Sequence, residues 1–178
     1  MVRQVIVRPH NPAWSRQFER ESQAIQGIMA DNLIAVHHMG STAIPGIYAK
    51  PIIDMLAAVA DIFPVDDQAT RLAALGYEAM GEYGIPGRRY FRKHDAAGTR
   101  THHLHVFQTG SAEIERHLVF RDYLIAHPEA AQVYSQLKQQ LAVAHPTDIE
   151  AYMDGKDGFI QTMEQKALEW QRSRLIPS

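Results

Sequence analysis

The sequence contains no cysteine, which excludes disulfide bridges, thiolate nucleophiles and zinc sites built from cysteine. It also has no apolar run near the ~20 residues that a membrane-spanning helix needs. The apolar character of the first residues, Met1–Pro9, breaks too early for the apolar segment of a secretory signal. We therefore expect a cytoplasmic protein that does not associate with membranes.

A strong net charge is missing as well. The formal net charge is −2 over 178 residues, so no overall field draws the chain to nucleic acid, and nucleic acid is not an expected partner. The apolar fraction of 46% and the length are typical of one folded domain covering residues 1–178. We expect a sheet-rich part over about 1–110 and a helical part over about 111–175. The oligomeric state is not set by these features.

The spacing of apolar residues predicts an α+β fold, with a mixed sheet covered by helices and a helical part at the end. Strands are expected at about 33–38, 51–59, 77–80, 89–93 and 101–107, and residues 2–7 form either a short strand or an ordered arm. Helices are expected at about 11–30, 66–75, 111–126, 129–144 and 148–172.

The loop that follows the first long strand carries Gly40, Ser41 and Thr42. Glycine lets the backbone turn with positive φ or approach a ligand closely, and the two hydroxyls with free N–H groups suit a phosphate. The same three residues also fit an ordinary turn. The continuation through Lys50 to Asp54 favours the phosphate interpretation, with Lys50 neutralising charge.

Asp54 lies within an apolar run, where a carboxylate loses hydration and needs a cation or N–H donors. It is predicted either to bind a metal or act as a general base, or to form a structural ion pair with Lys50. A second candidate lies in residues 101–107, where His103 and His105 would share one face of a strand. Two imidazoles at this spacing bind a transition metal or transfer protons, and they also occur as surface residues.

Basic residues further along the chain are candidates for binding phosphate. Arg88 follows a turn-rich loop, and its guanidinium suits phosphate, although a hairpin with a solvated basic end is an equal interpretation. Arg121 and Lys138 lie on predicted helices and are weaker candidates, because most helical charges only face solvent.

The string from His38 through Gly40-Ser41 to Gly46, continued by Lys50 to Asp54, resembles the signature of the GrpB family. The resemblance runs over about residues 5–170 and includes several later segments. These are Gly84–Arg88, His103–Val106, Phe120–Leu124, Tyr134–Lys138, Tyr152 with Lys156, and Phe159-Ile160. It implies a nucleotidyltransferase-like fold of the DNA polymerase β type, in which a Gly-Ser loop leads to a metal-binding aspartate. Some members are fused to dephospho-CoA kinase, a hint of nucleotide or cofactor metabolism.

The implied superfamily pattern places a second carboxylate two residues after the first, so that both grip metal ions on one strand face. Here Leu56 occupies that position and cannot bind a metal. His103 and His105 stand where a further carboxylate is expected on a neighbouring strand, and imidazole favours Zn²⁺, Mn²⁺ or Fe²⁺ over Mg²⁺. The site is thus expected to be altered.

Two functional hypotheses result. In the first, the protein binds a nucleotide or phosphorylated metabolite with a divalent metal (Mg, Mn or Zn) and catalyses transfer or hydrolysis at phosphorus. Asp54, His103 and His105 would then hold the metal or transfer protons, and Ser41 and Thr42 would contact phosphate. In the second, favoured by Leu56, it is a non-catalytic sensing or partner-binding module. The deciding observation is whether the aspartate and the histidines converge beside Ser41.

Overall fold

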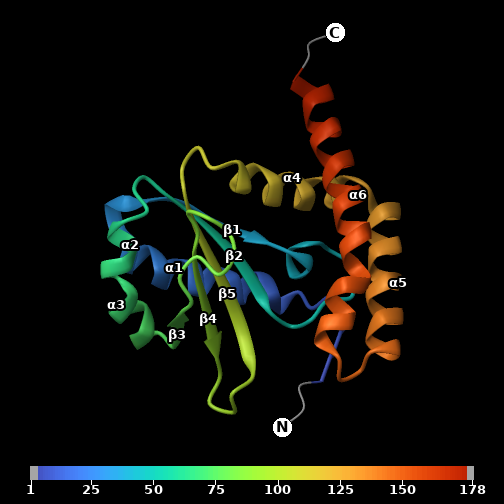
Figure 1. Cartoon of the computed structure of the whole chain (residues 1–178), viewed down its shortest axis with the longest axis horizontal. Coiled ribbons are helices and arrows are strands. Elements are labelled where there is room, and N and C mark those ends of the chain that lie inside the picture. The colour runs from blue at the N-terminus through green and yellow to red at the C-terminus, as the bar shows by residue number, and fades with distance from the viewer. Residues whose placement is uncertain (1–3, 176–178) are drawn as a thin grey trace.

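The computed structural model describes residues 4–175, and Figure 1 shows a central sheet with helices packed around it. The strands are β1 (Leu33–Met39), β2 (Ile53–Val59), β3 (Tyr77–Ala79), β4 (Arg89–His94) and β5 (Arg100–Gln108). The helices are α1 (Ala13–Met29), α2 (Pro64–Asp67), α3 (Ala69–Ala74), α4 (Ala112–Ala126), α5 (Pro128–Ala144) and α6 (Ile149–Leu175), with short 3-10 turns η1 (Ala30–Asn32) and η2 (Ser41–Ala43).

The sheet is mixed, with the strand order β1-β2-β5-β4-β3. Strands β2 and β5 run parallel, and every other neighbouring pair is antiparallel. A parallel pair needs a long crossover, and here the crossover contains α2, α3, β3 and β4. Because of this crossover, two segments nearly fifty residues apart become direct neighbours, with Asp54 opposite His103.

The alternation of side chains along β2 and β5 separates the core from the site. On one face, Ile53 and Met55 of β2 and Leu104 of β5 are buried in the main apolar cluster, together with residues of α1 such as Ile25 and Met29. The opposite face carries the even-numbered residues of β2 and the odd-numbered residues of β5. A chemically active residue on that face is therefore supported from behind by a packed core.

The helical part is joined to the sheet through the long loop before β2. Ile44 and Ile47 of this loop are buried against Leu124 of α4 and Tyr134 of α5. The backbone N–H of Tyr48 also donates to the Ser135 hydroxyl at 2.8 Å. These contacts fix α5 beside the loop, and α6 packs against both α4 and α5 at the right of Figure 1.

The sheet flanked by helices and followed by a helical part confirms the expected fold class, and most expected elements lie within two or three residues of their predicted bounds. The single helix expected at 66–75 is wrong. Two short helices occur instead, because Pro64 starts α2 early and the N–H of Gln68 bonds to Val65 at 3.1 Å, which closes that helix after one turn.

Of the expected strand or arm at residues 2–7, residues 2 and 3 lie outside the described part. The rest is an ordered arm with no strand, held by the bond from the N–H of Val5 to Pro146 at 2.8 Å and by the bridge between Arg8 and Ala49. Within residues 4–175, no helix combines the length and apolar character needed to cross a membrane.

Candidate functional site

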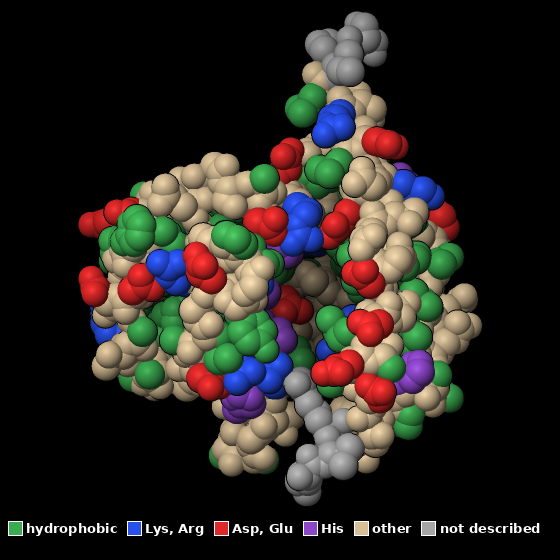
Figure 2. Space-filling model, viewed as in Figure 1, with side chains coloured by type: hydrophobic (Ala, Val, Ile, Leu, Met, Phe, Trp, Pro, Cys, Tyr) green, Lys and Arg blue, Asp and Glu red, His purple; other side chains and the backbone are tan. Residues whose placement is uncertain are grey.

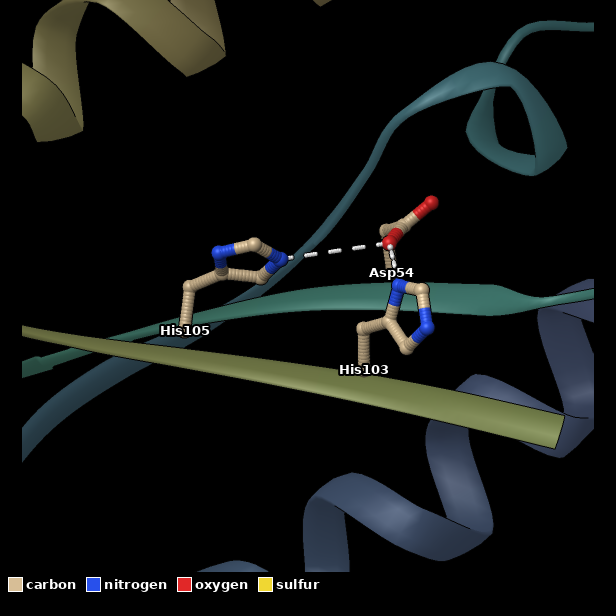
Figure 3. Close-up of side chains that lie close together, drawn as sticks. All are labelled: Asp54, His103 and His105. Carbon is tan, nitrogen blue, oxygen red and sulfur yellow. Dashed lines mark hydrogen bonds and ion pairs between the residues drawn. The ribbon is translucent and has the colours of Figure 1, made fainter. Parts of the chain in front are cut away.

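Asp54, His103 and His105 come together on the open face of the sheet (Figure 3). His103 is the direct neighbour of Asp54 in the parallel pair, and its Nδ1 donates to Asp54 Oδ1 at 3.0 Å. His105, one pleat further along β5, places Nε2 3.9 Å from the same oxygen. One ligand atom from each residue lies within 4.8 Å of the other two. The expected convergence is thus present.

Glycine is required at position 40 because the backbone there lies close to the carboxylate of Asp54. Met39, the last residue of β1, pairs with Asp54, so the chain leaves the sheet directly over the aspartate. Gly40 has φ +71° and ψ −172°, a conformation that is essentially confined to glycine. A Cβ at this position would lie 2.7 Å from Asp54 Oδ2. Hence no other residue fits between the loop and the carboxylate.

The two hydroxyls of the loop have different surroundings. Thr42 is buried, and its Oγ1 donates to the carbonyl of Ile52 at 3.3 Å while it accepts from His38 Nε2 at 2.9 Å. Burial lowers the pKa of His38 to about 4, so this imidazole is neutral at physiological pH. The Thr42 side chain therefore fastens the loop to the start of β2. Ser41 instead lies near the Tyr134 side chain on α5 and acts to lower the pKa of that phenol, which burial raises.

Asp54 is ionised at any physiological pH. Burial opposes the charge, but the hydrogen bond from His103 and the nearby Nε2–H of His105 outweigh it and hold the pKa of Asp54 well below the usual range. About 30% of its side chain is still open to solvent. The second ring nitrogen of His103, Nε2, is buried and has no hydrogen-bond partner among the described residues. The site thus combines an accessible carboxylate with an unused imidazole nitrogen.

Arg88 fixes the protonation pattern of His105. Its Nη1 lies 3.2 Å from His105 Nδ1, and a guanidinium can only donate, so that ring nitrogen is the acceptor. The proton of the neutral ring is therefore on Nε2, the atom that faces Asp54. Arg88 also donates to the carbonyls of Glu82 and Tyr83, at 3.1 and 2.7 Å, and only 6% of it is exposed. Arg88 is thus bound within the protein rather than extended toward solvent.

A second wall of the site consists of lysines and tyrosines from α5 and α6, together with Lys50 from the loop before β2. Lys138 Nζ lies 4.4 Å from the centre of the Tyr134 ring on α5, and Lys156 Nζ lies 4.7 Å from that of Tyr152 on α6. Lys50 Nζ lies 5.4 Å from the same Tyr152 ring. Figure 2 shows a hollow between the sheet and these helices, with histidine and acidic side chains on the sheet side.

The structure brings together most of the residues that the sequence singled out. Arg121 has a different setting. Its Nη1 donates to the backbone carbonyl of His38 at 2.9 Å, and its Nε and Nη2 contact Asp122. Its visible contacts therefore hold α4 to β1.

Tyr152 and Lys156 belong to the segments that resemble the GrpB family, but the sequence alone predicts no function for them. A usable signal was present, since Tyr134–Lys138 and Tyr152–Lys156 repeat the same i, i+4 spacing on successive helices.

The residue two positions after Asp54 explains the altered motif. Leu56 is fully buried and packs with Met39 and Phe107 on the same face as Asp54. The site therefore offers one carboxylate and two imidazoles, a donor set that fits Zn²⁺ or Mn²⁺ better than a pair of Mg²⁺ ions. An ion bound to His105 at Nε2 displaces the proton there, and the guanidinium of Arg88 works against it.

Comparisons with known proteins agree on one family. The family described as GrpB protein matches residues 4–166. The protein YqkA of Bacillus subtilis is 45% identical over 172 residues, 97% of this chain and 50% of its own length, so the chain spans half of that relative. A dephospho-CoA kinase of Mycolicibacterium paratuberculosis is 26% identical over 185 residues, 91% of this chain and 46% of its own length.

Among solved structures, the crystal structure of the conserved protein GrpB from Enterococcus faecalis is 47% identical, with a TM-score of 0.89. The match covers 93% of this chain and 99% of that one. The sequence match and this structural match cover nearly the whole chain. The chain belongs to the GrpB family.

Proposed function

We propose that this protein binds a nucleotide or another phosphorylated metabolite together with a divalent metal ion, and that it transfers or hydrolyses a phosphoryl or nucleotidyl group. The observation that carries the proposal is the convergence of Asp54, His103 and His105 directly under Gly40. An ionised carboxylate and two imidazoles would hold the ion, which when bound would neutralise charge on a phosphate. The dephospho-CoA kinase relative supports a nucleotide-like ligand.

In this proposal the residues of the chain have separate tasks. The N–H groups of the loop and the Ser41 hydroxyl bind phosphate, while Thr42 keeps the loop in place. Lys50 and Lys138 neutralise the remaining charge. Arg88 orients His105, whose Nε2–H then serves as a proton donor when no ion occupies that nitrogen.

A non-catalytic module that only binds a ligand or a partner is the second candidate, and Leu56 favours it. The side chain is part of a packed apolar cluster, and two-metal transfer needs a carboxylate at this position.

The two candidates are separated by metal content and turnover. The purified protein is analysed for bound metal, then titrated with Zn²⁺, Mn²⁺ and Mg²⁺ and assayed with a panel of nucleotides. We expect D54N to reduce affinity for Zn²⁺ or Mn²⁺ at least a hundredfold while circular dichroism shows an unchanged fold. The control is D67N, because Asp67 is an exposed carboxylate outside the site.

Each outcome selects one interpretation. Turnover of any nucleotide that disappears in D54N supports the enzyme. Metal and nucleotide binding without turnover supports the module. Unchanged metal affinity in D54N, or loss of folding in that variant, contradicts the proposed role of Asp54.

A further inference from the structure

The second wall of the site, called the lysine wall below, brings several positive charges together. Lys50, Lys138 and Lys156 gather their ammonium groups around two tyrosine rings, and Lys138 and Lys156 are 2% and 7% exposed. Burying an ammonium group without a partner is costly, and like charges nearby increase that cost. Such an arrangement is stable only where packing compensates for it or where an anion regularly occupies the site.

Two hydrogen-bonding groups of this wall are also unused. Lys138 Nζ and the Tyr152 hydroxyl are buried without a hydrogen-bond partner among residues 4–175. The tyrosine rings beneath Lys138 and Lys156 give cation–π attraction, but a ring face does not replace the hydrogen bonds that an ammonium group makes in water. Unsatisfied donors of this kind point to a missing acceptor.

The lysine wall also adjoins the phosphate-facing loop. Lys138 lies over the ring of Tyr134, and Ser41, which follows Gly40 above the carboxylate of Asp54, is close enough to the Tyr134 hydroxyl to act on its pKa. The negative charge of Asp54 acts on both Tyr134 and Lys156. An extended anion that starts at Asp54 and its metal would therefore reach the lysines by passing Ser41.

We propose that Lys50, Lys138 and Lys156, with the Tyr152 hydroxyl, bind the terminal phosphates of a polyphosphate chain. This inference rests on the proposed function and narrows it. The ligand is a nucleoside di- or triphosphate, or another ester with at least two linked phosphates, and not a monophosphate. A single phosphate bears about two negative charges near neutral pH, fewer than the positive charges that three ammonium groups and a divalent ion supply together.

The ionisation of the lysines agrees with this assignment. Burial, with the charges of Lys156 and Lys50, lowers the pKa of Lys138 to about 7. Burial and the charge of Lys50 lower the pKa of Lys156 to about 8, although Asp54 acts in the opposite direction. Tyr134 and Tyr152, the other titratable groups facing them, have pKa values raised by burial and stay neutral. At pH 8 the negative charge of an arriving polyanion should therefore raise the pKa values of these lysines, which then take up protons from the buffer.

The experiment measures anion binding separately from metal binding. Inorganic tripolyphosphate, pyrophosphate and orthophosphate are titrated into the full chain by calorimetry in the presence of a metal chelator. We expect tripolyphosphate to bind at least tenfold more tightly than orthophosphate. K138M and K156M should each weaken tripolyphosphate binding about ten- to hundredfold.

K166M is the matched control, because Lys166 lies on the same helix as Lys156 but is exposed, and it should change nothing. Titrations at pH 8 in buffers with different heats of ionisation should reveal proton uptake on tripolyphosphate binding. This uptake should shrink in K138M and in K156M.

Failure of this inference can be told apart from failure of the proposed function. Equal affinity for orthophosphate and tripolyphosphate, or unchanged tripolyphosphate binding in folded K138M and K156M, would overturn the polyphosphate assignment. Metal binding through Asp54 would then still support the proposed function. Loss of metal binding in D54N together with normal tripolyphosphate binding in the same variant would support both.

Discussion

The two walls of the hollow differ in how their buried charges are compensated. On the sheet side, Asp54 receives a hydrogen bond from His103 and faces the Nε2–H of His105, so its charge is compensated within the protein. On the helical side, Lys138 has a ring beneath it and no acceptor within the described part of the chain. The difference indicates that residues of the sheet wall themselves compensate the charge of Asp54, whereas the helical wall is arranged for an anion from outside.

The largest effect is expected from a change that disturbs only the sheet wall. G40A should lower the free energy of unfolding by about 2–4 kcal/mol, because an added Cβ combines an unfavourable backbone conformation with overlap on Asp54 Oδ2. Chemical denaturation measures this loss.

The control for G40A is G98A in the β4–β5 turn, where φ is also positive (+79°) but nothing lies within 4 Å of a Cβ. It should cost only the backbone strain, about 1 kcal/mol. Equal losses in the two variants would mean that the contact with Asp54 has no energetic effect.

The second effect concerns the helical wall and its dependence on pH. Lys138 has a folded-state pKa of about 7, below its ordinary value of 10.5. Between these values the unfolded chain binds more protons than the folded one, so stability without ligand should rise with pH. K138M removes this contribution, at most about 1.4 kcal/mol per pH unit.

Denaturation curves between pH 7.5 and 9.5 test the pH effect, because tyrosine ionisation is still small in that range. K138M should be more stable than the native chain at pH 7.5, and the advantage should shrink by pH 9.5. Wild-type and K138M curves that stay parallel across this range would show that Lys138 is already compensated in the folded protein. K166M should follow the native chain throughout.

The third effect concerns Arg88, which keeps the proton of the His105 ring on Nε2. R88M removes the donor to His105 Nδ1, so the ring proton can move to Nδ1 and leave Nε2 free to bind a metal. Zn²⁺ affinity should therefore rise about tenfold, or about 1.4 kcal/mol. Isothermal titration calorimetry measures this change in Zn²⁺ affinity. R89M, which removes a surface ion pair with Asp66, should leave Zn²⁺ affinity as it is. Weaker Zn²⁺ binding in R88M would mean that Arg88 supports the metal site.

The smallest effect distinguishes two glycines of α6. A Cβ on Gly155 would overlap Leu141 of α5, whereas Gly158 has nothing within 4 Å. G158A should gain about 1 kcal/mol from helix propensity. G155A should gain less stability than G158A, because the added Cβ overlaps Leu141. By moving α6 relative to α5, it should also weaken tripolyphosphate binding modestly. Identical stability and binding in the two variants would show that the close helix contact does not position Lys156.

The sequence anticipated the sheet wall better than the helical wall. Gly40, Asp54 and the histidine pair were recognisable because their roles depend on local properties, a positive φ, a charge in an apolar run and a two-residue alternation. Local sequence likewise predicts Thr42 and Arg88 as phosphate contacts. Their buried hydrogen bonds to Ile52 and to His105 depend on distant segments, which no local pattern describes.

By itself, the sequence determined which residues share a strand face and which loop must contain glycine, because these follow from backbone geometry over a few residues. Only the tertiary structure decided that β5 lies parallel to β2 in a register that sets His103 against Asp54. It also decided that α5 and α6 bring Lys138 and Lys156 together. Such placements depend on packing between segments far apart in the chain, and a lysine shows its cost only once its surroundings are known.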